Sequence, residues 1–108
     1  MNIKIFAKTR DGSSFAEAIY TGEKTIVLPG GKVKMKIAKS VRGGAFVQHF
    51  LDDRSYVSSE GEVLKECVFN SPSIAAMFIT GNASNGYRVW KLENGKTLGD
   101  YLKENNLR

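Results

Sequence analysis

The side chains of this 108-residue sequence that could bind a ligand are chiefly a run of lysines. Lys32, Lys34 and Lys36 alternate with three apolar residues in the segment KVKMKI. On a β-strand this alternation places the ammonium groups on one face, about 6.6 Å apart at about 3.3 Å per residue. Such a row can follow a phosphate backbone. Lysines on an exposed strand edge also discourage aggregation, so a purely protective role stays open.

The basic character continues after this run and is concentrated in one part of the sequence. Lys39 and Arg42 extend it as far as the glycine pair at positions 43 and 44. Residues 1–45 hold nine Lys or Arg and three Asp or Glu, whereas residues 46–108 hold seven and eight, within a net charge of +5. This asymmetry predicts an anionic partner, with nucleic acid first. A basic surface that only promotes solubility would have the same composition.

Side chains that could catalyse a reaction are scarce. His49 is the only histidine and Cys67 the only cysteine, and no motif joins them. Cys67 lies in an apolar run, which predicts a buried thiol. A nuclease would need acidic residues around a divalent ion, and the only such cluster in the sequence comprises Asp52, Asp53, Glu60 and Glu62. We therefore predict a non-enzymatic domain with no catalytic residue, no metal site and no cofactor.

The most specific stretch of the chain is residues 71–90, SPSIAAMFITGNASNGYRVW. Ser71 is a favourable N-cap, and Pro72 suits the first position of a helix. An apolar stripe follows, with two alanines that allow close packing on a sheet, and Gly81 supplies a left-handed C-cap. Turn residues then lead into Tyr87–Trp90, which we expect to begin a strand.

The end of this stretch completes the candidate binding surface. The amides of Asn82 and Asn85 can bond to base edges, and Tyr87 and Trp90 can stack on a flipped or unpaired base, beside the cation of Arg88. A structural alternative stays open for two of these residues. In a domain this small Trp90 can instead be a core residue, and Asn85 can instead belong to a simple turn.

The remaining elements predict an α+β fold, with an antiparallel β-sheet and two or three short helices packed on one face. We expect a hairpin of strands 2–9 and 13–20 and a strand over 25–28. We also expect a helix over 45–54, with Phe46, Val47, Phe50 and Leu51 on its apolar face. Short strands follow at 56–57 and 63–64, and a last helix begins after an N-cap at Thr97. The alternation of Lys32–Lys39 predicts a further strand.

Length and composition bound the class of protein. The chain is long enough for one hydrophobic core, and its 42% hydrophobic and 25% charged residues are typical of a globular domain. We divide it into a basic β-rich part (1–41), a core (42–102) and a frayed tail (103–108). No apolar run approaches the roughly 20 residues that cross a bilayer. We expect a cytoplasmic monomer with no membrane role.

Residues 71–98 resemble a small bacterial domain of unknown function. The shared features are Ser-Pro-Ser at position 71, the paired alanines, Asn-Gly at position 85, Trp90-Lys91, and Gly-Lys-Thr-Leu at position 95. That domain is found at the C-terminus of GIY-YIG nucleases and is similar to the RAMA (restriction-enzyme adenine-methylase-associated) domain. Ile74 and Tyr87 depart from its usual alanine and tryptophan.

The resemblance implies a role beside DNA restriction or modification. Together with the basic surface, it predicts a non-catalytic accessory domain that binds DNA, including modified or unpaired DNA. The alternative is a protein–protein adaptor that docks a nuclease or methyltransferase subunit. Its binding surface would be apolar and aromatic, and the lysines would only keep the domain soluble.

Overall fold

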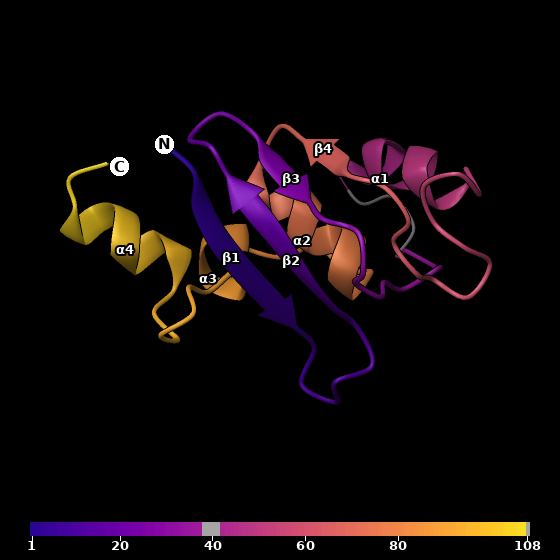
Figure 1. Ribbon diagram of the computed structural model, residues 1–108, viewed down its shortest axis with the longest axis horizontal. Coiled ribbons are helices and arrows are strands. Elements are labelled where there is room, and N and C mark those ends of the chain that lie inside the picture. The colour runs from indigo at the N-terminus through magenta and orange to yellow at the C-terminus, as the bar shows by residue number, and fades with distance from the viewer. Residues whose placement is uncertain (38–41, 108) are drawn as a thin grey trace.

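The computed structural model describes residues 1–37 and 42–107. Within these residues, four antiparallel strands form one sheet in the order β1 (Ile3–Lys8), β2 (Phe15–Tyr20), β3 (Thr25–Val27) and β4 (Cys67–Phe69). Figure 1 shows β1 and β2 in front of the central part of the helical layer. The predicted α+β fold with an antiparallel sheet is confirmed.

The hairpin of β1 and β2 follows from local sequence. Ile5 and Ala7 of β1 are buried and alternate with exposed lysines, so the strand has one apolar face. Gly12 takes the left-handed conformation (φ 76°) in the turn. The carboxylate of Asp11 accepts hydrogen bonds from the backbone N–H and hydroxyl of Ser13, at 3.0 and 2.8 Å. These bonds fix the turn that sets the register of the hairpin.

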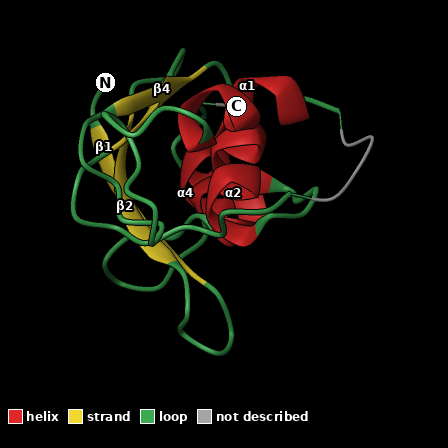
Figure 2. Cartoon of the chain, turned by 90° about the vertical axis from the view of Figure 1, so that its right-hand side faces the viewer, coloured by secondary structure: helices red, strands yellow, loops and turns green. Residues whose placement is uncertain are grey.

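Four helices of the described chain lie on one side of the sheet: α1 (Gly44–Leu51), α2 (Pro72–Thr80), α3 (Gly86–Val89) and α4 (Leu98–Glu104). In Figure 2, strands and helices form two separate layers. The central helix α2 contacts all four strands. Ala75 and Ala76 are completely buried, and their small side chains allow this close approach, as the sequence predicts.

The caps of the helices agree with the sequence. The Ser71 hydroxyl accepts a hydrogen bond from the N–H of Ile74 at 3.1 Å, and Gly81 ends α2 with φ 78°. The Thr97 hydroxyl accepts one from the N–H of Asp100 at 3.1 Å, at the start of α4. Each cap satisfies backbone groups that a helix end leaves unpaired. No helix in the described part of the chain is long and apolar enough to span a membrane.

Two predicted strands are wrong, and the predicted strands at 56–57 and 63–64 are reduced to one isolated bridge between Val57 and Val63. Residues 87–90 belong to α3 and its C-cap, because Asn85 caps a helical turn that starts at Gly86. In the lysine segment, as far as the structure describes it, only Lys32 is paired, in isolated bridges to Phe15 and Glu62. Residues 33–37 leave the sheet and pass the C-terminal end of α2, where a Cβ on Gly81 would lie 2.8 Å from the carbonyl oxygen of Lys36.

One predicted helical face also needs correction. Sequence periodicity assigns Phe46, Val47, Phe50 and Leu51 to the buried side of α1. Val47 and Leu51 are buried, but Phe46 is 58% exposed. Since α1 packs mainly against α2, its surface near Phe46 is left open to solvent.

Candidate functional site

The loop of residues 82–85, between α2 and α3, is the centre of the predicted binding surface. Asn82, Ala83 and Asn85 are exposed. The loop is held by short-range bonds, in which the hydroxyls of Thr80 and Ser84 both donate to the carbonyl oxygen of Asn82, at 3.0 and 3.1 Å. The loop therefore presents its side chains from a defined backbone.

Two of the predicted lysines lie beside this loop. Lys34 and Lys36 line a hollow of about 250 Å³ together with Thr80, Gly81 and Asn82. The side chains of both lysines are exposed. The lysine segment therefore meets the α2–α3 loop, although it does so as irregular chain and not as a strand.

Arg42 lies on another side of the loop. It shares a hollow of about 270 Å³ with Ser71, Ser73, Ala83 and Ser84. Among the described residues that line this hollow and the Lys34–Lys36 hollow, none is acidic. The loop is thus flanked by cations on two sides, a setting that favours an anion.

The remaining polar candidates face a third hollow, of about 460 Å³, against α4. Asn85, Tyr87 and Arg88 line it with Asp100 and Lys103. The side-chain oxygen of Asn85 accepts a hydrogen bond from the N–H of Tyr87 at 3.1 Å, so this oxygen caps α3. Tyr87 is half-buried and packs against the core. Asn85 and Arg88 are exposed, and Arg88 shares this hollow with the carboxylate of Asp100.

The structure separates two predicted site residues from this surface. Trp90 is completely buried, and its indole Nε1 donates a hydrogen bond to the carbonyl oxygen of Pro72 at 2.9 Å. It is a core residue and cannot stack on a base, so its place in the candidate site is corrected. Lys32 is bridged to Phe15 of β2 and to Glu62, and it does not line the Lys34–Lys36 hollow. Lys39 lies outside the described residues.

The histidine and the cysteine, which the sequence sets apart from the site, have structural positions of their own. His49 is exposed and its ring packs edge-on to Phe50, with 5.3 Å between ring centres. Burial raises the pKa of the Cys67 thiol to about 12. Among the described residues, no three His, Cys, Asp or Glu side chains gather as metal ligands.

Sequence reasoning missed a group of exposed residues on the sheet. Phe6 and Phe15 point to the face opposite the helices, and Phe15 is 43% exposed. The signal was present in the first strand, because Phe6 falls between Lys4 and Lys8 on the wet face.

The described residues define a small α+β domain whose sheet is covered on one face by helices and whose α2–α3 loop is bordered by cations. The chain belongs to DUF4357, a family described as a domain of unknown function, whose model matches residues 6–102. No curated protein and no solved structure matches the chain.

Proposed function

We propose that this domain is a non-catalytic accessory module that binds DNA and functions together with enzymes of DNA restriction or modification. The observation that carries the proposal is the α2–α3 loop, with Lys34 and Lys36 on one side and Arg42 on another. These cations are exposed, and no described acid lines their two hollows. Lysine and arginine at this density supply the salt-dependent part of nucleic-acid binding.

The roles within the surface follow from side-chain chemistry. Lys34, Lys36 and Arg42 contact phosphates, because they are exposed and no described carboxylate lines their hollows, although Lys34 also attracts the Asp11 carboxylate. Asn82 presents an exposed amide between them and contacts a base edge. Asn85 and Tyr87 support the loop from α3, and Arg88 extends the basic surface toward α4.

The association with DNA modification rests on the resemblance of residues 71–98 to domains of GIY-YIG nucleases and to the RAMA domain. The structure gives the shared motif a scaffolding role. Ser71 caps α2, and the hydrogen bonds from Trp90 to Pro72 and from Gly86 to Ser73 hold α3 against the start of α2. Recognition of a modified base would therefore fall to the exposed loop that this scaffold positions.

The test is a binding measurement with duplex and single-stranded DNA, with and without adenine methylation, at two salt concentrations. We expect binding that weakens as salt rises, since phosphate contacts release counterions. A dependence on methylation would support a role in reading modification. Absence of binding at low salt would refute the DNA-binding function.

A protein–protein adaptor is the second candidate, and a different surface favours it. An apolar groove of about 400 Å³ lies between α1, β4 and α2, and is lined by Phe46, Phe50, Val68 and Ile74 among others. Phe46 and Val68 are 58% and 48% exposed. Exposed apolar residues that line a groove mark a protein-binding site. Co-purification with a nuclease or methyltransferase subunit that Phe46→Glu abolishes, and Lys34→Glu does not, would support this function.

A further inference from the structure

The face of the sheet opposite α2 carries aromatic rings and lysines. In the described chain, all four helices lie on the other side of the sheet (Figures 1 and 2). Because side chains alternate along a strand, the outward positions are those between the buried ones. Here we call the outward side chains the outer sheet face: Lys4, Phe6, Lys8, Phe15, Glu17, Ile19, Ile26, Lys32, Val68 and Lys91.

The strand register places lysines directly beside the two rings. Residues that lie opposite each other in an antiparallel pair direct their side chains to the same face. Phe15 lies between Lys8 on β1 and Lys32, which it pairs with through hydrogen bonds of 2.9 and 2.8 Å. Phe6 likewise lies opposite Lys91, through hydrogen bonds of 2.7 and 2.9 Å. Each ring therefore has at least one cation as its immediate neighbour.

The charges on this face are unbalanced. Glu17 lies opposite Phe6 and forms an ion pair with Lys4 at 3.4 Å. The Lys4 ammonium also lies 6.0 Å from the centre of the Phe6 ring. Lys8, Lys32 and Lys91 form no ion pair with any carboxylate in the described chain. Glu62 lies opposite Lys32 in an isolated bridge, but the two side chains are not ion-paired. An anion would meet three unpaired cations here.

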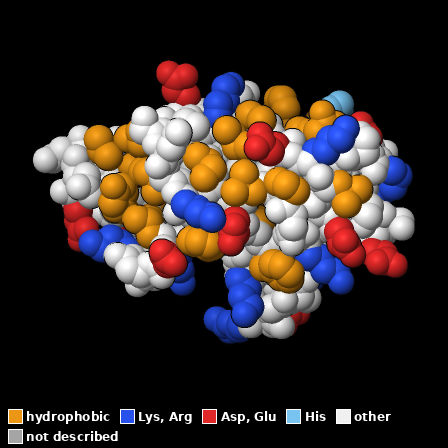
Figure 3. All heavy atoms as spheres, in the orientation of Figure 1, with side chains coloured by type: hydrophobic (Ala, Val, Ile, Leu, Met, Phe, Trp, Pro, Cys, Tyr) orange, Lys and Arg blue, Asp and Glu red, His pale blue; other side chains and the backbone are white. Residues whose placement is uncertain are grey.

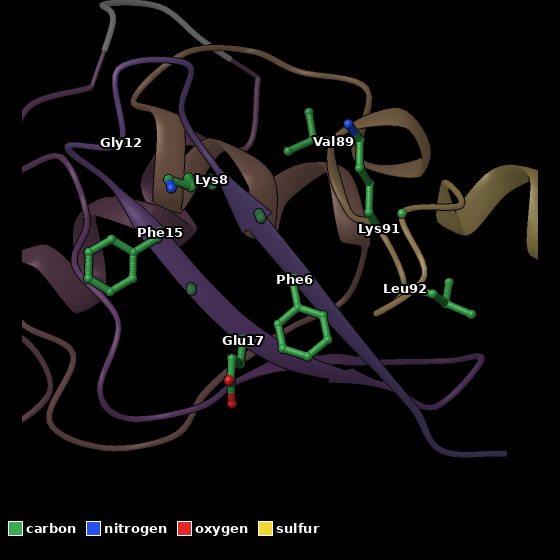
Figure 4. Close-up of a pocket in the computed structure, with 11 residues that line it drawn as sticks. Phe6, Lys8, Gly12, Phe15, Glu17, Val89, Lys91 and Leu92 are labelled. Atoms are coloured by element: carbon green, nitrogen blue, oxygen red, sulfur yellow. The ribbon is translucent and has the colours of Figure 1, made fainter.

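The rings also border a groove. An open hollow of about 630 Å³ is lined by Phe6, Lys8, Phe15, Glu17 and Lys91, together with residues that follow α3. Figure 4 shows both phenyl rings on the near side of β1 and β2, with Glu17 projecting on the same side. In Figure 3, hydrophobic and basic side chains are interspersed over this view of the molecule. A flat apolar group and an anionic group can thus be bound side by side.

We propose that the outer sheet face binds single-stranded nucleic acid. Phe6 and Phe15 stack on unpaired bases, and Lys8, Lys32 and Lys91 contact the phosphates that connect them. Aromatic rings on a basic surface are how proteins bind single strands without reading a sequence, because every base has a π-face. A duplex keeps those faces stacked internally, so the rings select unpaired strands. This face is separate from the α2–α3 loop and does not depend on the function proposed for it.

The first test compares Phe15→Ala with the wild type for binding a labelled oligothymidylate and a blunt duplex of equal length. We expect Phe15→Ala to weaken oligothymidylate binding roughly 5- to 150-fold, the range for loss of one stacked base. Phe15→Tyr keeps a ring and should bind like the wild type. Phe46→Ala is the matched control, because it removes an exposed phenyl ring from α1, which lies outside the outer sheet face.

The second test raises affinity instead of lowering it. Glu17→Gln removes the acid that lies beside the two rings and frees Lys4, so it should strengthen oligothymidylate binding. Glu23→Gln changes the net charge equally, but at an exposed turn outside the rows of paired residues. A gain in oligothymidylate affinity that only Glu17→Gln shows supports the proposal. Equal gains in both variants would mean that net charge alone determines the affinity, and they would overturn the proposal.

The emission of the buried Trp90 reports whether each variant is folded. Unchanged oligothymidylate binding by Phe15→Ala, with wild-type emission, would overturn the stacking role. Equally tight binding of poly-aspartate would assign this face to acidic peptides and would also overturn the proposal. If Lys34→Glu loses duplex binding and the variants of the outer sheet face keep it, the loss is assigned to the α2–α3 loop and the two surfaces act separately, as proposed.

Discussion

The indole Nε1 of Trp90 donates a hydrogen bond of 2.9 Å to the carbonyl oxygen of Pro72, across 18 residues of sequence. Pro72 is the first residue of α2, and Trp90 is the C-cap of α3. A second bond runs in parallel, from the N–H of Gly86 to the hydroxyl of Ser73 at 2.9 Å. The two contacts fix α3 against the start of α2, and so they set the path of the 82–85 loop.

We predict that Trp90→Phe destabilises the domain by about 1–3 kcal/mol. The substitution leaves a buried carbonyl without its side-chain donor and opens space in the core. The measurement is urea unfolding followed by circular dichroism, because the variant lacks the only tryptophan. Phe46→Leu, on an exposed site, is the control and should change stability little. Equal stability of the Trp90→Phe variant would mean that the bond contributes nothing.

For Gly86→Ala, packing and helix propensity predict changes of opposite sign in the free energy of unfolding. Within a helix, Ala is favoured over Gly by about 1 kcal/mol. A Cβ at this position would collide with the backbone of Pro72 and Ser73, so we expect a loss of about 1–3 kcal/mol instead. A stabilised variant in thermal unfolding would show that α3 does not press against α2 as described.

Ser71→Ala removes the N-cap of α2 and should cost about 1 kcal/mol. The hydroxyl accepts from the N–H of Ile74 at 3.1 Å, and the variant leaves that group without its side-chain acceptor. Chemical denaturation measures the change, with Ser59→Ala as a control at an exposed turn position. If both variants unfold at the same denaturant concentration, the cap has no energetic role.

Much of the fold could be predicted because its signals are local. The β1–β2 hairpin depends on a turn a few residues long, and the caps at Ser71 and Thr97 each act within three residues. The helical turn at Tyr87–Trp90 could not be predicted in this way. It depends on the contact of Gly86 with the start of α2, which is distant in sequence, whereas aromatic and β-branched residues locally favour a strand.

The candidate site could be predicted only in part. The alternation of Lys34 and Lys36 with apolar residues predicts that exposed and buried side chains alternate. The structure has this alternation, although the segment does not pair as a strand. The pattern therefore identifies the exposed cations but not that they border Asn82, since this proximity depends on the end of α2. For Trp90 the sequence could not distinguish a binding residue from a core residue, because an indole ring suits both. The packing in the structure shows that Trp90 is buried in the core.

The turn at Asp11 predicts a loss of stability in acid. Hydrogen bonds from the Ser13 backbone N–H, the Ser13 hydroxyl and the Thr9 hydroxyl lower the pKa of the Asp11 carboxyl from 3.8 to about 2. Because this pKa is lower in the folded state, the contribution is present above about pH 4 and is lost as the pH falls toward 2. Unfolding midpoints measured across this range should fall less in Asp11→Asn than in the wild type.

Thr9→Val offers a graded comparison at the same turn. It removes one of the three donors to Asp11, so the pKa of the carboxyl should rise from about 2 while the Ser13 bonds remain. The titration is followed by NMR at the carboxyl carbon of Asp11. A midpoint that does not move in Thr9→Val would exclude the Thr9 hydroxyl as a cause of the low pKa.

Lys34→Glu tests where phosphate is bound. If Lys34 contacts a phosphate beside the α2–α3 loop, the variant should bind every DNA sequence more weakly and show a smaller salt dependence. Affinities measured at several salt concentrations give the slope, which should fall by about one for each phosphate that the variant no longer binds. Lys24→Glu is the matched control, since Lys24 is exposed in the β2–β3 turn, where its ammonium donates to Asn70. An unchanged slope in Lys34→Glu would place the phosphate contacts elsewhere, because removing a cation that binds phosphate must reduce the number of counterions released.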